Sequence, residues 1–482
     1  MEAAADIKIT VTEGEPRPKD AVPYGDSPHF PPTFESLAFQ DKVDFIICKI
    51  DILLTRLLNK ILHHPDFQKI EASWRGLYYL CGCSTGTAPI KIKFLDIKLT
   101  ELAQSFQRAP DVEDSLLFNL VYNQEFGMPG GEPFGVLLCD YHIRHHPTKN
   151  HRVDDVELLT ALSIVGAAAF APVITSASPE LFGVNSFVEL ERLRQLQKFS
   201  GQIEHARFNR FTRSEDSRFL GITLPRVLMR PPYLADNCLN LAFNYRENYE
   251  GLSHEKFCWG SSVYPFGEVL IRSFEQYGWF ANITGVLQGE ITCGVVNGLR
   301  NFFVETDPDE IIPRPGVEIA IIGQLEDDLR DAGFISLTVC KDTELLAFRS
   351  VPSIQVPQRY EKQIASSNAR ISSSLDNIFC VSRFAHYIKV QMRDKVGSYQ
   401  TADEMEKKIS EWLSRYATAN DNASLEVKAR YPLRDFGVEI KELAGRPGEF
   451  YCKLLFKPHF KVENMNVSLQ LQMKISSTKN IR

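Results

Sequence analysis

The sequence predicts an α+β or mixed α/β protein of several domains. The chain has 482 residues, which is enough for two or three domains with buried cores. Helical and strand-like patterns alternate from about residue 63 to 310, whereas the chain beyond residue 416 is mostly strand-like. Pro313 and Pro315 indicate a domain boundary between these two regions.

The composition is that of an ordinary globular protein. Apolar residues make up 44% of the chain and charged residues 24%, and the formal net charge of −7 argues against nucleic acid as the main partner. The charge is uneven: residues 382–482 carry 18 Lys and Arg against 12 Asp and Glu, a net +6, which leaves −13 for residues 1–381. This basic end could face an acidic partner or form an ordinary solvated surface.

The ten cysteines form no recognisable metal or disulfide pattern. The closest pair is Cys81 and Cys83, and no second pair follows at the spacing of a zinc site. We therefore expect reduced thiols, as in a cytoplasmic protein, with no metal and no cofactor. The N-terminus lacks the basic and apolar regions of a signal peptide.

The N-terminal region predicts an extended arm followed by a helix. Residues 1–40 are rich in Pro, Glu and Asp, which is typical of a segment that orders only against another surface. Residues 41–62 form a strongly apolar helical pattern. Its main stripe recurs at spacings of four and three and comprises Ile46, Ile50, Leu53, Leu57 and Ile61. Such a helix either packs on its own domain or binds a partner helix.

Residues 158–179 carry no charge and approach the length of a membrane span. Many of them are Ala, Ser, Thr, Gly and Pro, which insert weakly into a bilayer. Asp154, Asp155 and Glu157 precede the segment, as suits the first turn of a helix. The sequence therefore predicts a buried helix that breaks near Pro172 and no membrane insertion, with a membrane span as the alternative.

Three other segments of the middle region have weaker patterns. Residues 90–97 alternate like a strand. Ser186 and Glu189 have the spacing of a capping box, which predicts a helix to about residue 197. Residues 201–220 are polar and Arg-rich, so they predict a surface loop.

The region after the proline boundary predicts helices followed by strands. Residues 317–323 form an apolar run typical of a strand, and residues 357–395 predict two helices in series. Another helix is predicted over residues 402–416, with one apolar face. Strand-like patterns follow, with alternation over residues 425–431 and an apolar run over residues 450–456.

The last strand pattern is the longest and most regular. Its apolar residues occupy every second position and are Met465, Val467, Leu469, Leu471, Met473 and Ile475. Polar residues fill the positions between them. A strand with one apolar face invites aggregation unless another strand pairs with it.

Few residues suggest chemistry. Residues 127–135 are Gly-rich but lack the Gly-Lys-Ser/Thr ending of a phosphate-binding loop, so they predict a tight turn. Asp140, His142 and Glu132 are the most plausible site of a metal- or nucleotide-dependent enzyme, which is the alternative function. Glu71, close to a Trp and an Arg in the sequence, predicts a buried ion pair, with an active-site carboxylate as the alternative. We expect no catalytic residue.

Six segments along the chain carry a resemblance to a known family. They are HPDFQKIEASWRGLYYL (64–80), FGMPGGEPFGVLLCDY (126–141), FAPVITSASPELFG (170–183), QYGWF (276–280), SRFAHYIKVQMRDKVGSY (382–399) and RPGEFYCKLLFKPHF (446–460). In this order they resemble the large sheath subunit of bacterial type VI secretion systems, from about residue 40 to 475. The chain departs from the family pattern at residues 283–295, where Thr284 stands in the position of an Arg.

The resemblance implies a multidomain contractile-sheath fold without catalysis. Its implied parts are an N-terminal arm (1–40), a helix that binds a small sheath subunit (41–62), a middle and outer α/β domain (63–315) and a β-rich inner domain (316–482). Family members pair with the small subunit, and the pairs stack as helical rings around an inner tube. Contraction of the sheath drives this tube into a target cell.

The resemblance also implies partners in the bacterial cytoplasm. These are the small sheath subunit, further copies of the chain, the inner tube protein, the baseplate and an AAA+ unfoldase that recycles the sheath through the small subunit. Family members exchange strands between neighbours, and residues 465–475 match that strand. For the tube contact the candidate residues are His386, Lys389, Arg393, Lys407 and Lys408, with ordinary solvated helix faces as the alternative.

Overall fold

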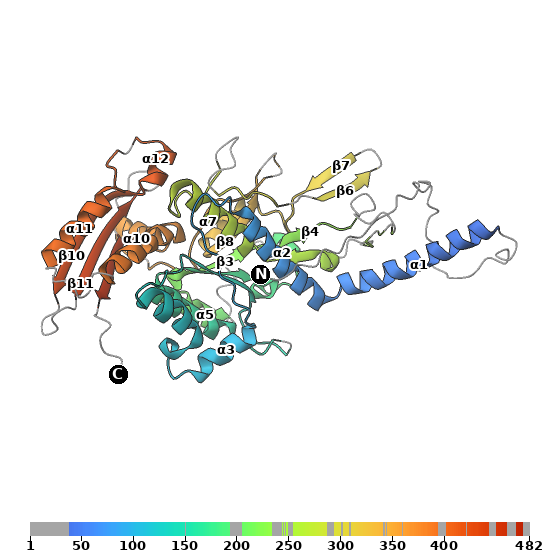
Figure 1. Cartoon of the computed structure of the whole chain (residues 1–482), viewed down its shortest axis with the longest axis horizontal. Coiled ribbons are helices and arrows are strands. Elements are labelled where there is room, and N and C mark those ends of the chain that lie inside the picture. Colours follow the sequence, from blue (N-terminus) through green and yellow to red (C-terminus); the bar gives the residue numbers. More distant parts are fainter. Residues whose placement is uncertain are drawn as a thin grey trace, which may run out of the picture. The chain divides into compact units, whose positions relative to one another are not determined.

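The protein is described by a computed structural model. It describes residues 38–149, 151–192, 205–233, 243, 245, 247–248, 254–286, 294–299, 302–307, 310–340, 343, 345–358, 360–393, 402–420, 422–442, 450–459 and 469–475. The chain forms two compact units. One unit comprises the chain up to Ile61 together with Tyr233–Asn248, and the other comprises Leu62–Pro232 and Tyr249–Arg482. Figure 1 shows their helices and strands coloured along the sequence.

The first unit is built around the long helix α1 (Phe39–Leu62). The last turns of α1 are tied to the returning segment, because Tyr245 Oη donates a hydrogen bond to Asn59 Oδ1 at 2.7 Å. The backbone N–H of Asn248 donates to the same oxygen at 3.3 Å. The predicted apolar helix is therefore confirmed as an element.

The second unit contains a five-stranded sheet in the order β1-β2-β3-β8-β9. The strands are β1 (Leu137–Ile143), β2 (Val173–Ala177), β3 (Leu220–Leu224), β8 (Phe334–Val339) and β9 (Leu346–Phe348). The first four run parallel and β9 is antiparallel to β8. Because β2 and β3 are buried along their whole length, they read as continuous apolar or small-residue runs and not as alternating ones.

Helices cover both faces of this sheet. On one face, Leu159 and Leu162 of α5 (Asp155–Ala169) pack in one cluster with Ile222 of β3. On the other face, Phe266 of α7 (Val263–Tyr277) packs with Ile335 of β8 and with α10 (Leu375–Arg393). The predicted boundary at 315/316 divides this sheet, because β8 and β9 lie beyond it and complete the same core.

The C-terminal region packs helices on a three-stranded antiparallel sheet. Its strands are β10 (Leu433–Glu442), β11 (Phe450–Pro458) and β12 (Leu469–Ile475), in that order. α10 and α11 (Ala402–Ser414) lie against this sheet. The Phe384 ring stacks on Trp279 at 4.1 Å and on Phe456 at 5.6 Å, so aromatic contacts join α10 to β11.

The remaining elements are short or peripheral. The helices are α2 (Pro65–Cys83), α3 (Leu99–Arg108), η2 (Val112–Asp114), α4 (Leu116–Phe118), η3 (Asn119–Gly127), η4 (Pro179–Phe182), η5 (Phe187–Arg192), α6 (Ala206–Phe211), η8 (Asp216–Phe219), η10 (His254–Lys256), α8 (Gln324–Asp331), α9 (Gln363–Ser372) and α12 (Leu425–Arg430). The strands are β4 (Val227–Arg230), β5 (Cys258–Gly260), β6 (Phe302–Asp307) and β7 (Glu310–Arg314). α9 and α10 confirm the predicted pair of helices in series.

Three segments with strand patterns do not form the predicted strands. Residues 425–431 begin with the helix α12, because Ser424 Oγ accepts a hydrogen bond from the Val427 N–H and caps it. Residues 90–97 belong to no strand of the described chain, and residues 317–323 contain only isolated bridges at Val317 and Ile321.

The structure also differs from two further predictions for the middle region. The sequence predicts a surface loop over residues 201–220, but the described part contains α6, whose Phe208 and Phe211 are buried. The helix expected after Ser186 is the short 3-10 helix η5, and residues 193–200 lie outside the described residues.

The uncharged segment near residue 160 forms the buried helix α5, as predicted. Asp154 caps it, with Oδ1 accepting from the N–H groups of Val156 and Glu157 at 3.2 and 3.3 Å. The helix ends at Ala169, and Phe170 adopts a left-handed conformation shortly before Pro172, so the predicted break is confirmed. Across the described residues, no helix combines the length and apolar character that crossing a bilayer demands.

Candidate subunit-interaction sites

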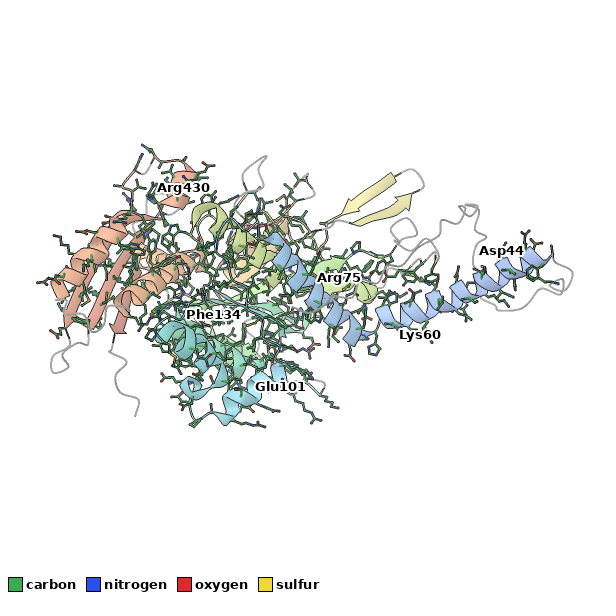
Figure 2. All side chains as sticks on the ribbon, viewed as in Figure 1. Asp44, Lys60, Arg75, Glu101, Phe134 and Arg430 are labelled. Carbon is green, nitrogen blue, oxygen red and sulfur yellow. The ribbon has the colours of Figure 1, made fainter. Side chains whose placement is uncertain are left out.

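The apolar stripe of α1 is exposed. None of the 24 residues of the helix is buried. The exposed fractions of the predicted stripe are 47% for Ile46, 48% for Ile50, 62% for Leu53, 56% for Leu57 and 44% for Ile61. Asp44 and Lys60 lie toward the two ends of the same helix (Figure 2). The described residues of the first unit therefore leave a long apolar surface available to a partner.

The described part of the C-terminal strand is paired within its own chain. β12 runs antiparallel to β11, with Leu469 opposite Phe456 and Ile475 opposite Phe450. It lies at the edge of the three-stranded sheet among the described residues. Met465 and Val467 lie outside the described residues. Exchange of this strand between subunits is not seen in a single chain and stays a prediction.

The tube-facing assignment is wrong for His386 and Arg393, which are buried at 2% and 9% exposure. The Nε2 atom of His386 lies 2.9 Å from the Ala169 carbonyl oxygen. Burial, and secondarily the charge of Arg383, lowers the pKa of His386 to about 3, which leaves the ring neutral at physiological pH. Both side chains therefore pack inside the fold and do not present a solvent-facing surface.

The interior position of Arg393 has a clear cause. Its guanidinium donates hydrogen bonds to the carbonyl oxygens of Phe126 and Gly131, each at 3.3 Å. These carbonyls belong to the Gly-rich segment 127–135 and its approach, where Gly130 has a positive φ of 82° and the Gly131 N–H bonds to the Met128 carbonyl. The predicted tight turn is thus present, and Arg393 fastens it to α10.

The lysine candidates differ from one another in exposure. Lys389 is half-buried over the Phe126 ring, 5.4 Å from its centroid. Burial, then the nearby Arg393 charge, lowers the pKa of Lys389 below its usual value. Lys407 and Lys408 are exposed on α11, so these two lysines are the available candidates for a contact with the tube.

Two carboxylates of the alternative enzyme site serve as structural contacts. Asp140 Oδ2 accepts hydrogen bonds from Ser73 Oγ at 2.5 Å and from Tyr264 Oη at 2.9 Å, which joins β1 to α2 and α7. Glu132 lies in an ion pair with Lys91, with Nζ–Oε1 at 2.6 Å. Asp140 therefore connects three elements of the fold, and Glu132 joins two segments outside the helices and strands.

The third candidate of that site, His142, lies in β1 opposite Ser176 of β2. No group of three metal-ligating side chains occurs in the described part of the chain. The structure therefore does not assemble Asp140, His142 and Glu132 into one site.

Glu71 also has a structural environment, as the sequence predicts. Its Oε1 accepts from Arg230 Nε at 2.7 Å and from Arg75 Nε at 2.8 Å. The Arg230 and Glu71 side chains are only 4% and 9% exposed. The pair ties α2 to β4.

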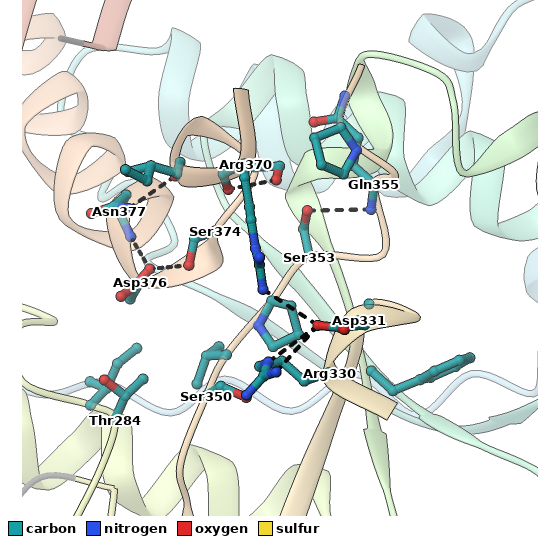
Figure 3. A pocket seen from close by; sticks show the side chains of 18 of the residues that line it. Thr284, Arg330, Asp331, Ser350, Ser353, Gln355, Arg370, Ser374, Asp376 and Asn377 are labelled. Atoms are coloured by element: carbon teal, nitrogen blue, oxygen red, sulfur yellow. Dashed lines mark hydrogen bonds and ion pairs between the residues drawn. The ribbon is translucent and has the colours of Figure 1, made fainter. Parts of the chain in front are cut away.

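A cleft of about 1570 Å³ lies in the second unit (Figure 3). It is larger than the roughly 300–1,000 Å³ of typical small-molecule sites. Three of its arginines face carboxylates: Arg330 and Arg370 each approach Asp331 Oδ1 at 3.4 Å, and Arg349 lies 2.9 Å from Glu326 Oε2.

One exposed surface was missed by the sequence argument. Large side chains of α2 point to solvent beside residues 91–96, and they include Trp74 and Tyr78 with exposed fractions of 61% and 83%. The spacing of apolar residues along α2 and the alternation over residues 90–97 were the available indications. The sequence could not show that these two apolar faces lie together outside the core.

The comparisons with known proteins agree with one another. Residues 44–355 match the family described as EvpB/VC_A0108, tail sheath N-terminal domain, and residues 364–475 match the EvpB/VC_A0108 tail sheath gpW/gp25-like domain. The chain is similar to the type VI secretion system sheath protein TssC1 of Pseudomonas aeruginosa, with 36% identity over 440 residues that cover 91% of this chain and 86% of the relative. The chain belongs to the tail sheath family of type VI secretion systems.

Proposed function

We propose that this chain is the large structural subunit of a contractile type VI secretion sheath and that it pairs with a small sheath subunit through α1. The exposed stripe of α1 carries this proposal. A 24-residue helix without a buried residue is not stabilised by packing within the described first unit. A partner helix would cover the stripe at the spacing of three and four residues that helix pairs use.

The heterodimers would polymerise as helical rings around an inner tube, and contraction would propel the tube into a target cell. Neighbouring subunits would be linked by the strand over residues 465–475. This link suits a moving lattice, because main-chain hydrogen bonds can persist while subunits rotate as rigid bodies. The assembly would stand on a baseplate in the bacterial cytoplasm, and an AAA+ unfoldase would recycle it through the small subunit.

The proposed role requires no catalysis, cofactor, nucleic acid or membrane insertion by this chain. The family match to sheath domains over residues 44–355 and 364–475 supports a structural role. No contact within the described chain favours the alternative enzyme, because Asp140 and Glu132 are engaged in separate structural contacts.

The proposal is tested by introducing charge into the stripe. Co-expression of the chain with the small sheath subunit should give a stable heterodimer and, in negative-stain microscopy, hollow striated tubes. Leu53→Asp with Leu57→Asp should weaken heterodimer formation by at least about 100-fold, because two apolar contacts are lost and two carboxylates meet an apolar surface.

The matched control places the same residue type off the stripe. Arg56→Asp with Lys60→Asp should leave the heterodimer intact, since both positions are exposed and neither belongs to the apolar stripe. Equal binding by the stripe variant and the control would contradict pairing through α1. A wild-type chain that stays a monomer beside the small subunit would contradict the proposed function as a whole.

A further inference from the structure

The second unit carries an exposed apolar patch that the proposal above does not use. Four apolar side chains of α2 lie at spacings of three and four, so they share one helix face. They are Phe67, Ile70, Trp74 and Tyr78, with exposed fractions of 38%, 60%, 61% and 83%. Phe94 is 61% exposed, and its ring centroid lies 5.9 Å from that of Trp74. We call these five residues the α2 patch.

Residues 91–96, which include Phe94 of the α2 patch, have no backbone partner among the described residues. None of their backbone N–H or C=O groups bonds there to another backbone group. All six residues are exposed, and Ile92 and Leu95 add exposed fractions of 40% and 49%. Unpaired main-chain groups beside apolar side chains are the features that allow another strand to add.

The side chains of this segment alternate as they do in a strand. Lys91 forms an ion pair with Glu132, and Lys93 forms one with Glu125 of η3, so both lysines reach the end of η3 or the turn that follows it. Phe94, the next residue along the chain, instead reaches α2. At the end of the segment the Ile97 carbonyl accepts a hydrogen bond from Tyr141 Oη of β1 at 2.7 Å. The segment is therefore held in place from both sides before any partner arrives, which reduces the entropy cost of binding.

We infer that residues 91–96 accept an extended strand of the small sheath subunit and that the α2 patch holds apolar side chains next to that strand. This inference rests on the proposed function and adds a second contact for the same partner. Main-chain hydrogen bonds would align the added strand, and Trp74 and Phe94 would supply most of the apolar contact.

The choice of this partner follows from chain continuity. α2 begins at Pro65, directly after the His63-His64 pair that follows α1. A subunit held by α1 is thus tethered close to the start of α2. Because α2 has 19 residues, it is only about 28 Å long, so the whole of the α2 face lies within that distance of its start. Tethering raises the effective concentration of a second contact, so a weak strand pairing suffices.

A second copy of this chain suits the site less well. Two copies that paired through the same segment would form a closed two-fold dimer, whereas a helical sheath needs contacts that repeat without closing.

Hydrogen–deuterium exchange of the full-length chain tests the main-chain contact directly. The amides of residues 91–96 should exchange rapidly in the chain alone and at least about 100-fold more slowly in the complex with the small subunit. A complex that forms while these amides stay unprotected overturns this inference and leaves the proposed function standing. Protection that appears in the chain alone and rises with its concentration assigns the site to a second copy and also overturns it.

A matched pair of variants tests the patch. Ile70→Asp should weaken binding of the small subunit by about tenfold or more, because it places a carboxylate in the middle of the patch. Ile322→Asp is the control, since Ile322 is exposed to nearly the same extent, 61% against 60%, and lies outside the patch. Equal affinities for the two variants, both folded by circular dichroism, would overturn the role of the patch. If the wild-type chain itself did not bind the small subunit, the proposed function would be refuted.

Discussion

The Glu71 carboxylate is bound by two arginines that differ in burial. Arg230 is 4% exposed and Arg75 is 42% exposed, yet each Nε lies within 2.8 Å of the same carboxylate oxygen. A buried ion pair costs much desolvation, and the loss of one buried partner leaves that cost uncompensated. An exposed ion pair contributes little, because water already solvates the charge.

Replacing each arginine separately should therefore give unequal effects. We expect Arg230→Gln to lower the free energy of unfolding by about 3 kcal/mol and Arg75→Gln by less than about 1 kcal/mol. Urea unfolding followed by circular dichroism measures both changes. Equal losses would show that the carboxylate is not held mainly by the buried partner.

The spacing of residues along α10 does not determine whether their side chains are buried or exposed. His386, Lys389 and Arg393 do lie on the one helix, but His386 and Arg393 are buried by contacts with the carbonyl oxygens of Ala169, Phe126 and Gly131. Spacing predicts a shared face and cannot say whether that face meets water. The partner carbonyls come from segments more than 200 residues away in the chain.

Among the elements, β12 has a strand pattern that could pair either within its own chain or with a neighbouring subunit. The strand pairs with β11 in its own chain, and its other edge has no strand beside it in the described residues. The same side-chain alternation would suit a sheet shared between neighbouring subunits.

Truncation separates these possibilities. We expect that removal of residues 465–482, or Leu469→Pro, abolishes sheath assembly and leaves heterodimer formation with the small subunit intact, because the ladder between neighbours is lost. Negative-stain microscopy and co-purification measure the two properties. Removal of residues 476–482 alone is the control and should permit assembly. Long sheaths built from the longer truncation would contradict strand exchange.

Two other elements show what local pattern cannot settle. Residues 425–431 alternate apolar and polar side chains, yet Ser424 caps a helix there, since so short a segment cannot distinguish the two periods. Residues 90–97 have a strand pattern but no neighbouring strand in the described chain. A strand needs a partner, and the sequence of one segment does not contain it.

For the whole molecule, the uneven charge is the property that bears on assembly. The C-terminal fifth carries a net +6 against −13 for the rest of the chain. Of the candidate tube-facing residues, Lys407 and Lys408 are exposed on α11. A charged contact with the tube would steer assembly and set the register more than it would add affinity.

Charge reversal on α11 tests this contact. We expect Lys407→Glu with Lys408→Glu to impair sheath assembly on the inner tube, with the heterodimer unaffected, because two repelling charges per subunit repeat along the lattice. Counting assembled sheaths by electron microscopy measures the effect. Lys441→Glu, a reversal at an exposed lysine of β10, should assemble normally. Normal assembly of the double variant would refute the assignment of α11 to the tube.

The sequence by itself determined the elements whose periodicity is long and strong, namely α1, α5, the pair α9 and α10, and the last strand. The sequence also indicated the family, because each of the six ordered motifs is a short contiguous segment that can be recognised without the structure. The tertiary structure alone decided which of these surfaces are open. α1 and the α2 patch are exposed, whereas His386 and Arg393 are buried, because burial depends on segments far apart in the sequence that fold against each other.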